Sequence, residues 1–164
     1  MRAPPNNKVE VRLDIRRSTL ASADAAPLIA ALNAELKATF PEPGATHVSL
    51  TGAQVEAGDG AFLVAYLDDV AVGCGAVRRL DEATAELKRM YVDPSVRGRG
   101  IGRALVETLE REARQLGVTR IVLETGTRLA AAIRLYEGMG YERIPLFGEY
   151  VSSPDTSLCF GKSY

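Results

Sequence analysis

The fold of this chain is decided by the stretch VDPSVRGRGIGRALVETLEREARQLG, residues 92–117. A strand-like segment ends at Val92, Pro94 follows in a turn, and glycines alternate with arginines from Arg97 to Arg103. Apolar residues then recur at spacings of four and three, which predicts an amphipathic helix that ends at Gly117. The apolar stripe comprises Ile101, Leu105, Leu109, Ala113 and Leu116.

The glycine-rich turn before this helix has the features of an anion site. The N-terminus of a helix exposes backbone N–H groups and carries about half a positive charge, to which arginine side chains add. Glycines let a phosphate approach the backbone because they have no Cβ. The turn therefore predicts a phosphate or pyrophosphate site, and a solvated Gly/Arg turn without a ligand is the alternative at this point.

Two common nucleotide motifs do not fit the turn. The chain has no GxxxxGK[ST] sequence, so the turn is not a P-loop. A GxGxxG fingerprint would need glycine at position 103, where Arg103 stands. The turn also lies in mid-chain rather than inside an opening βαβ unit.

Hydrophobic periodicity and turn residues define the other elements. The predicted order is a strand over 9–15, a helix over 24–40, a loop over 41–60, a hairpin of strands over 61–67 and 70–77, and a strand over 83–92. After the helix of the opening stretch come a strand over 119–125, a helix over 128–139 and a strand over 156–162. Helices that alternate with strands after an antiparallel meander predict an α/β (α+β) domain with a mixed sheet.

Composition limits the class of protein. With 164 residues, 46% of them apolar, the chain fits one domain over 8–164, preceded by a disordered arm over 1–7. A net charge of −1 argues against nucleic acid or a membrane surface as a partner. The sequence lacks an apolar run of membrane-spanning length and an apolar signal core, so we expect a cytoplasmic protein. Cys74 and Cys159 have neither a CxxC spacing nor a nearby histidine pair, so no metal site is expected.

Two motifs resemble those of the GCN5-related N-acetyltransferases. The turn matches the R/Q-x-x-G-x-G/A motif of that family, with Arg97, Gly100 and Gly102 at its fixed positions. Downstream, AAIRLYEGMGY (131–141) is similar to the second motif, A-I-x-L-Y-E-K-x-G-F. The resemblance covers residues 60–164 and implies a mixed central sheet flanked by helices, in which two splayed parallel strands form an acetyl-CoA cleft.

The resemblance also assigns the cofactor site. The two splayed strands would be those over 83–92 and 119–125, and acetyl-CoA would be the co-substrate, without a metal. Backbone groups of Met90, Tyr91 and Val92 would pair with the pantetheine arm and polarise the thioester carbonyl. The pyrophosphate would lie on Arg97, Gly98, Arg99, Gly100, Ile101, Gly102 and Arg103.

Two residues are predicted to be catalytic. Glu86 resembles the strand glutamate that acts as general base in several family members, and a regular strand would place it on one face with Lys88, Met90 and Val92. The alternative for Glu86 is an exposed glutamate in an ion pair. Tyr136, in the second motif, is expected to protonate the departing thiolate, and its alternative role is packing of the helix on the sheet. Direct transfer to a primary amine of a small molecule or peptide would follow, in a ternary complex.

Two positions depart from the family pattern. Leu129 stands where many members have an asparagine that contacts the pantetheine, and Gly138 replaces a lysine. The first departure leaves open a non-catalytic acyl-CoA-binding or sensing module of the same fold. Dimers are common in the family, so a homodimer is compatible with the resemblance.

Candidate residues for the acceptor site lie in two loops. His47, in the loop over 41–60, is one candidate, and an exposed loop histidine is the alternative. Phe147, Glu149 and Tyr150 precede the last strand and would suit a cationic amine.

Overall fold

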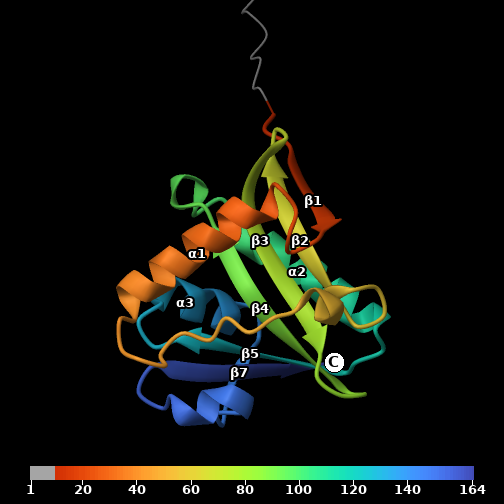
Figure 1. Cartoon of the computed structure of the whole chain (residues 1–164). Helices are drawn as coiled ribbons and strands as arrows, with labels where there is room; N and C mark the ends of the chain where they lie inside the picture. The colour runs from red at the N-terminus through yellow and green to blue at the C-terminus, as the bar shows by residue number, and fades with distance from the viewer. Residues whose placement is uncertain (1–9) are drawn as a thin grey trace, which may run out of the picture.

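The computed structural model describes residues 10–164, so the arm predicted over 1–7 and the domain start at residue 8 lie outside the described part. The described residues form a seven-stranded sheet in the order β1-β2-β3-β4-β5-β7-β6 (Figure 1). β4 and β5 are parallel and the other neighbouring pairs are antiparallel, which confirms the predicted mixed sheet. The strands are β1 (Leu13–Ser18), β2 (Gly60–Leu67), β3 (Val70–Arg79), β4 (Thr84–Val92), β5 (Arg120–Gly126), β6 (Glu142–Ile144) and β7 (Ser157–Ser163).

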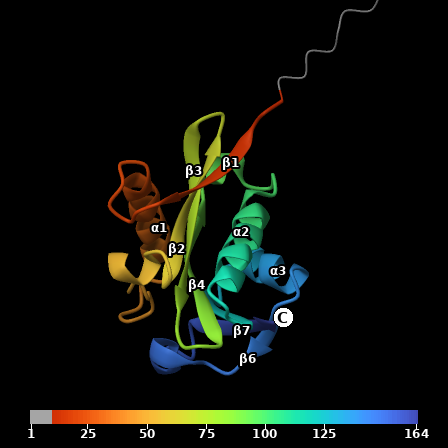
Figure 2. The same cartoon turned by 90° about the vertical axis from the view of Figure 1, so that its right-hand side faces the viewer.

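The sheet lies between two helical layers (Figure 2). α1 (Ala25–Thr39) covers one face, and α2 (Ile101–Gln115) and α3 (Ala130–Gly138) cover the other. Strand β2 and the middle of β3 are apolar on both sides because both of their faces are covered, whereas β4 includes the buried charged residues Glu86, Lys88 and Arg89. Four residues of the predicted stripe, Ile101, Leu105, Leu109 and Ala113, are buried on α2, and the fifth, Leu116, follows the helix and is half-buried. Short 3₁₀ turns lie between the other elements. These turns are η1 (Gly52–Val55), η2 (Pro94–Val96) and η3 (Gly148–Ser152).

The predicted hairpin is confirmed, because Asp68 and Asp69 adopt the positive φ angles, 46° and 66°, that a tight two-residue hairpin turn requires. The first strand begins later than predicted, since its pairing with β2 starts at Leu13 opposite Leu67. β6 and η3 were not predicted. Both are short and lie in a segment without clear periodicity.

The residue that precedes α1 does not cap it. Asp24 precedes the helix, but its carboxylate accepts a hydrogen bond from the Tyr66 hydroxyl at 2.6 Å and does not cap the helix. The Ser22 hydroxyl accepts the Ala25 N–H at 3.1 Å instead. A tertiary contact has therefore replaced the local one.

A β-bulge in β4 overturns the prediction that Glu86, Lys88, Met90 and Val92 share one face. Ala76 pairs with Lys88 and Cys74 with Tyr91, so two residues of β4 lie opposite one residue of β3. Arg89, at the bulge, has a φ of 58°. The core clusters and the strand register show which residues of β4 face each side of the sheet. Glu86, Lys88 and Tyr91 face α1, whereas Leu87, Met90 and Val92 face α2.

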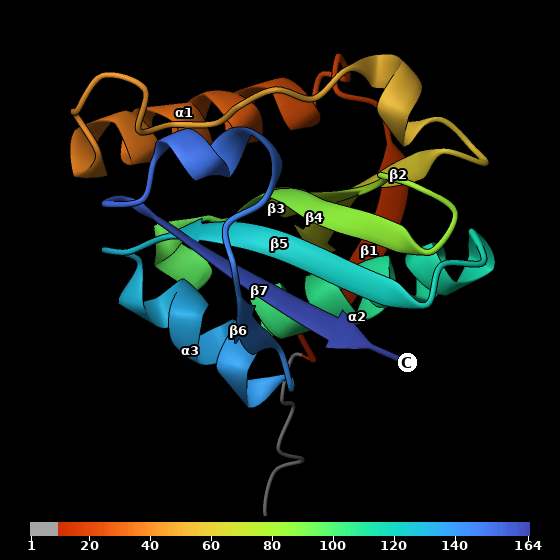
Figure 3. The same ribbon diagram turned by 90° about the horizontal axis from the view of Figure 1, so that it is seen from below.

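The two parallel strands separate next to the bulge. β4 pairs with β5 only from Thr84 opposite Arg120 to Leu87 opposite Leu123. Beyond this point the strands run apart (Figure 1), with α1 on one side of the sheet and α3 on the other (Figure 3). The splayed parallel strands expected from the motifs are thus present.

Candidate active site

A cleft of about 640 Å³ occupies the opening between β4 and β5. On the α2 side its walls come from the glycine-rich turn and the first turns of α3, and on the α1 side from α1, residues 45–47 and Tyr150. The cleft is therefore lined by elements of both faces of the sheet. Two reactants can meet in it from opposite sides.

The glycine-rich turn has the geometry of an anion site. Gly98 and Gly100 have φ angles of 80° and 81°, a left-handed conformation that glycine adopts without strain. The first hydrogen bond of α2 is donated by Ala104 to the Gly100 carbonyl at 3.0 Å, so the N–H groups of residues 101–103 precede the helical ladder. These N–H groups lie at the positive end of the helix and are available to a phosphate.

Most of the predicted cofactor residues line the cleft. They are Met90, Tyr91, Val92, Arg97, Gly98, Gly100, Ile101, Gly102 and Arg103, whereas Arg99 lies in the turn without lining it. Arg97 also joins the turn to β4 and α1, and its role in binding the pyrophosphate stays a prediction. Its Nε donates to the Val92 carbonyl at 2.8 Å, and its Nη2 pairs with Glu35 of α1 at 2.7 Å.

Tyr136 lies in the wall of the cleft on the α3 side and is 5% exposed. Its ring packs edge-on against Tyr141, with centroids 5.9 Å apart. Burial, with a smaller contribution from the charge of Glu124, raises the pKa of the Tyr136 phenol. The hydroxyl therefore keeps its proton at neutral pH.

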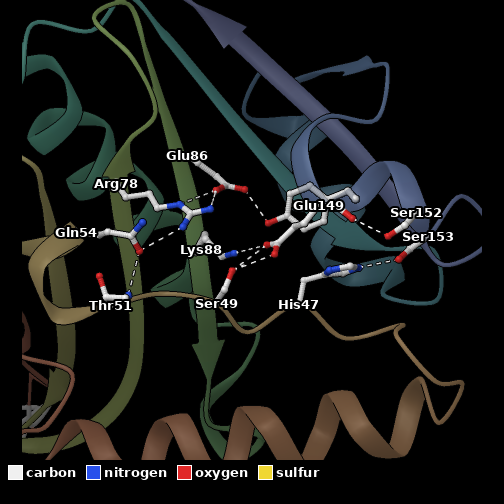
Figure 4. A network of polar contacts seen from close by, with 11 residues as sticks. His47, Ser49, Thr51, Gln54, Arg78, Glu86, Lys88, Glu149, Ser152 and Ser153 are labelled. Atoms are coloured by element: carbon white, nitrogen blue, oxygen red, sulfur yellow. Dashed lines mark hydrogen bonds and ion pairs between the residues drawn. The ribbon is translucent and has the colours of Figure 1, made fainter.

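Glu86 is placed away from the cleft wall. It is fully buried, and both of its oxygens are engaged (Figure 4). Oε1 accepts from Arg78 Nε at 2.9 Å, with Arg78 Nη2 at 2.7 Å, and Oε2 accepts from the Tyr150 hydroxyl at 2.7 Å. The catalytic role of Glu86 stays a prediction, and the observed contacts describe a buried ion pair.

Glu124 is a candidate that the sequence reasoning missed. It lies on β5 one residue beyond the last pair with β4, and it lines the cleft. Leu123 packs in the core on the α2 side, so strand alternation directs Glu124 toward the α1 side. Burial raises the pKa of the Glu124 carboxyl to about 7. Its place at the carboxyl end of an apolar parallel strand, where α/β sheets bind ligands, is the signal that could have found it.

Lys88 and Glu149 form an ion pair beside the cleft, with Nζ 2.8 Å from Oε1 (Figure 4). Ser49 donates its hydroxyl to the same carboxylate, at 3.0 Å from Oε2. Burial is the largest single influence on the pKa of Glu149 and raises it. The contacts with Lys88 and Ser49 together outweigh burial, so the pKa of Glu149 is lowered overall. Glu149 does not line the cleft, whereas its partner Lys88 does.

His47 and Tyr150 line the cleft on the α1 side, and their role in binding the acceptor stays a prediction. His47 Nε2 lies 2.8 Å from the Ser153 hydroxyl, and its ring meets Tyr150 edge-on at 4.9 Å. Phe147 packs against Tyr150 at 5.2 Å without lining the cleft. The loop histidine is therefore held in place rather than exposed.

The two departures from the motif occupy different places. Leu129 precedes α3 and lines the cleft, whereas Gly138 ends α3 at an exposed position. Within residues 10–164, no group of three or more His, Cys, Asp or Glu side chains could hold a metal ion. None of the helices in this same range is long and apolar enough to cross a membrane.

Comparison with known sequences decides the family. A sequence model described as the acetyltransferase (GNAT) family matches residues 28–141. The chain belongs to this family. A curated member, the IAA acetyltransferase of Azospirillum brasilense, is 44% identical over 94 residues, which cover 57% of this chain and 61% of that protein. The match therefore spans less than two thirds of that relative's length.

Solved structures of acetyltransferases share the fold over most of the chain. A Klebsiella pneumoniae protein named as an acyl-CoA N-acyltransferase is 32% identical with a TM-score of 0.77, over 92% of this chain and 97% of that one. A GNAT family acetyltransferase from Elizabethkingia anophelis, solved with acetyl-CoA bound, has a TM-score of 0.67 at 16% identity, over 93% and 98%. The acetyltransferase fold inferred from the two motifs is thus confirmed.

Proposed function

We propose that this member of the acetyltransferase family is an acetyl-CoA-dependent N-acetyltransferase that moves an acetyl group directly to a primary amine of a small molecule or peptide. One observation carries the proposal: a single cleft holds the N-terminus of α2, the edge of β4 without a β5 partner, Tyr136 and Glu124. The acetyl-CoA held by the Elizabethkingia relative supports the choice of donor. Cytoplasmic location and a homodimer stay predictions from the sequence.

The chain's residues fit acetyl-CoA along the α2 side of the cleft. The N–H groups at the start of α2 would receive the pyrophosphate, and Arg103, which pairs with Glu107, lies beside them. Backbone groups of Met90 and Val92, on the edge of β4 that β5 leaves free, would hold the pantetheine arm as an added strand. Arg97 would keep the turn and β4 in register through its bond to the Val92 carbonyl.

The amine would arrive from the α1 side, where Glu124 lies. Glu124 takes a proton from the ammonium, the freed amine nitrogen bonds to the thioester carbonyl carbon, and the carbon–sulfur bond breaks. Tyr136 gives its proton to the departing thiolate, and the nitrogen, which must lose a second proton to become an amide, passes it through solvent to restore the Tyr136 hydroxyl. A base with a pKa of about 7 suits this step at neutral pH, and Glu124 has an open path to the cleft that Glu86 lacks.

A covalent acetyl-cysteine intermediate is disfavoured by the state of the thiols. Burial raises the pKa of Cys74 to about 12 and that of Cys159 to about 11. Because the thiolate is the nucleophile, both groups are inactive near neutral pH. Transfer in a ternary complex is therefore the mechanism that we propose.

The experiment that tests the proposal follows release of free thiol from acetyl-CoA in the presence of a broad panel of primary amines. Glu124→Gln should lower kcat by about 100-fold or more, as loss of a general base does, and Glu86→Gln serves as the matched carboxylate control. If Glu86→Gln alone abolishes turnover in a folded protein, the assignment of the base returns to Glu86. Binding of acetyl-CoA without turnover on any amine would favour the sensing module, for which Leu129 in the cleft wall is the supporting observation.

A further inference from the structure

The charges that line the cleft are paired, with two exceptions. Glu35 pairs with Arg97, Lys88 with Glu149, Arg103 with Glu107, and Arg128 with Glu42. Among the described residues, Arg89 and Glu124 line the cleft without an ion-pair partner. A structural charge is normally compensated by a neighbour, so these two are the charges that the fold leaves for a ligand.

Arg89 is held in an unusual way. It is 8% exposed, and among residues 10–164 the partner of its guanidinium side chain is the Asn33 amide oxygen of α1. A single hydrogen bond to an amide oxygen uses one of the five N–H donors of a guanidinium and does not neutralise its charge. Desolvation by burial lowers the pKa of Arg89, as expected for a cation without a carboxylate beside it.

The bulge determines on which side of the cleft the Arg89 guanidinium lies. A positive φ at a non-glycine residue is disfavoured, and here it coincides with the extra residue in β4. The contact with Asn33 places the guanidinium on the α1 side of the sheet, the same side to which Glu124 is directed. The glycine-rich turn lies at the start of α2, in the opposite layer, so the pyrophosphate does not account for Arg89.

We infer that the acetyl acceptor is an amine that also carries a carboxylate, as an amino acid does, and that Arg89 binds this carboxylate while Glu124 faces the amine. The inference rests on the proposed function and adds the class of acceptor to it. A planar guanidinium binds a carboxylate through two parallel N–H bonds, which gives orientation as well as charge recognition. Asn33 is then a positioning residue that fixes the guanidinium toward the cleft.

The test compares each common L-amino acid with its own amide, which lacks the carboxylate charge. Binding is measured by titration calorimetry with and without CoA, and transfer is measured by thiol release from acetyl-CoA at one fixed pH. We expect at least one acid to be preferred over its amide by about tenfold or more in affinity and in kcat/KM, as for a desolvated charge pair. In Arg89→Gln this preference should fall to about twofold or less.

Two further variants separate recognition from folding. Arg89→Lys keeps the positive charge and should keep most of the preference, and both Arg89 variants should bind acetyl-CoA like the unchanged protein. Arg128→Gln removes an arginine from the same cleft whose charge Glu42 already compensates, so the acid-to-amide ratio should not change. Intrinsic differences in reactivity between acid and amide cancel when the ratio is compared across variants.

The inference is overturned if Arg89→Gln keeps the full preference, if no acid is preferred over its amide, or if no amino acid binds. The proposed function fails in a different way, through absence of thiol release with every primary amine, including amines that lack a carboxylate. If an amino acid and its amide give equal rates of thiol release, the proposed function still holds but amino acids are excluded as the preferred class of acceptor.

Discussion

Replacing Glu124 by glutamine should make the protein more stable, and by an amount that depends on pH. The carboxyl group has a pKa of about 7 in the folded protein against an ordinary value of 4.5, because burial disfavours its charged form. At 1.36 kcal/mol per pH unit, this difference corresponds to a destabilisation of at most about 3 kcal/mol when the group is ionised in both states.

The pH window follows from the sign of the shift. Below pH 4.5 the carboxyl is protonated in the folded and in the unfolded chain, so the substitution should have little effect on stability. Between 4.5 and about 7 the folded protein keeps a proton that the unfolded chain has released, so the stability of the unchanged protein falls as pH rises. The advantage of Glu124→Gln should therefore grow across this window and level off above pH 7.

Urea unfolding followed by circular dichroism at pH values from 4 to 8.5 measures this difference. Glu82→Gln is the control, because Glu82 is exposed and its replacement removes a charge without affecting the cleft. A stability difference for Glu124→Gln that is the same at every pH would refute the reasoning, as would a loss of stability at pH 8. The same variant should be more stable and less active, since a base held in a poorly solvated cleft serves catalysis at the expense of stability.

Three further substitutions test other parts of the account. Tyr136→Phe should lower kcat by about 100-fold while the affinity for acetyl-CoA stays nearly constant; full activity would leave packing as the role of this ring. Gly100→Ala should destabilise the fold by about 1–2 kcal/mol and weaken acetyl-CoA binding by about tenfold. Gly117→Ala is the control, because Gly117 has a similar φ of 82° away from the cleft, and this variant should lose stability without losing affinity. Equal losses of affinity in the two variants would contradict an anion site at Gly100. Glu86→Leu should lower the free energy of unfolding by about 3 kcal/mol, because the half-buried Arg78 guanidinium then keeps only the Gln54 amide oxygen as a partner and loses its carboxylate. The double variant with Arg78→Met should recover part of this loss, and an unchanged urea midpoint would refute the structural role of the pair.

Much of the fold follows from local sequence. The apolar stripe from Ile101, the glycine-rich turn and the Asp68-Asp69 hairpin are each specified by residues close together in the chain, and all three appear as predicted. The splayed strands could be predicted only through the resemblance, since no residue pattern alone shows that β4 and β5 separate.

The site was harder to predict because it depends on one bulge. The segment ELKRMYV has the composition of a regular strand, and none of its residues predicts a positive φ at Arg89. The bulge moves Met90 and Val92 to the face opposite Glu86, so an alternation argument chose the wrong neighbours. The partners of Glu86 come from β3 and η3, which sequence spacing cannot bring together.

A crystal structure of the protein with acetyl-CoA tests the central claim most directly. We expect the pyrophosphate on the N–H groups at the start of α2, the pantetheine along the free edge of β4, and the thioester between Tyr136 and the end of the cleft that Glu124 faces. Acetyl-CoA outside the β4–β5 opening, or a thioester remote from both side chains, would contradict the account.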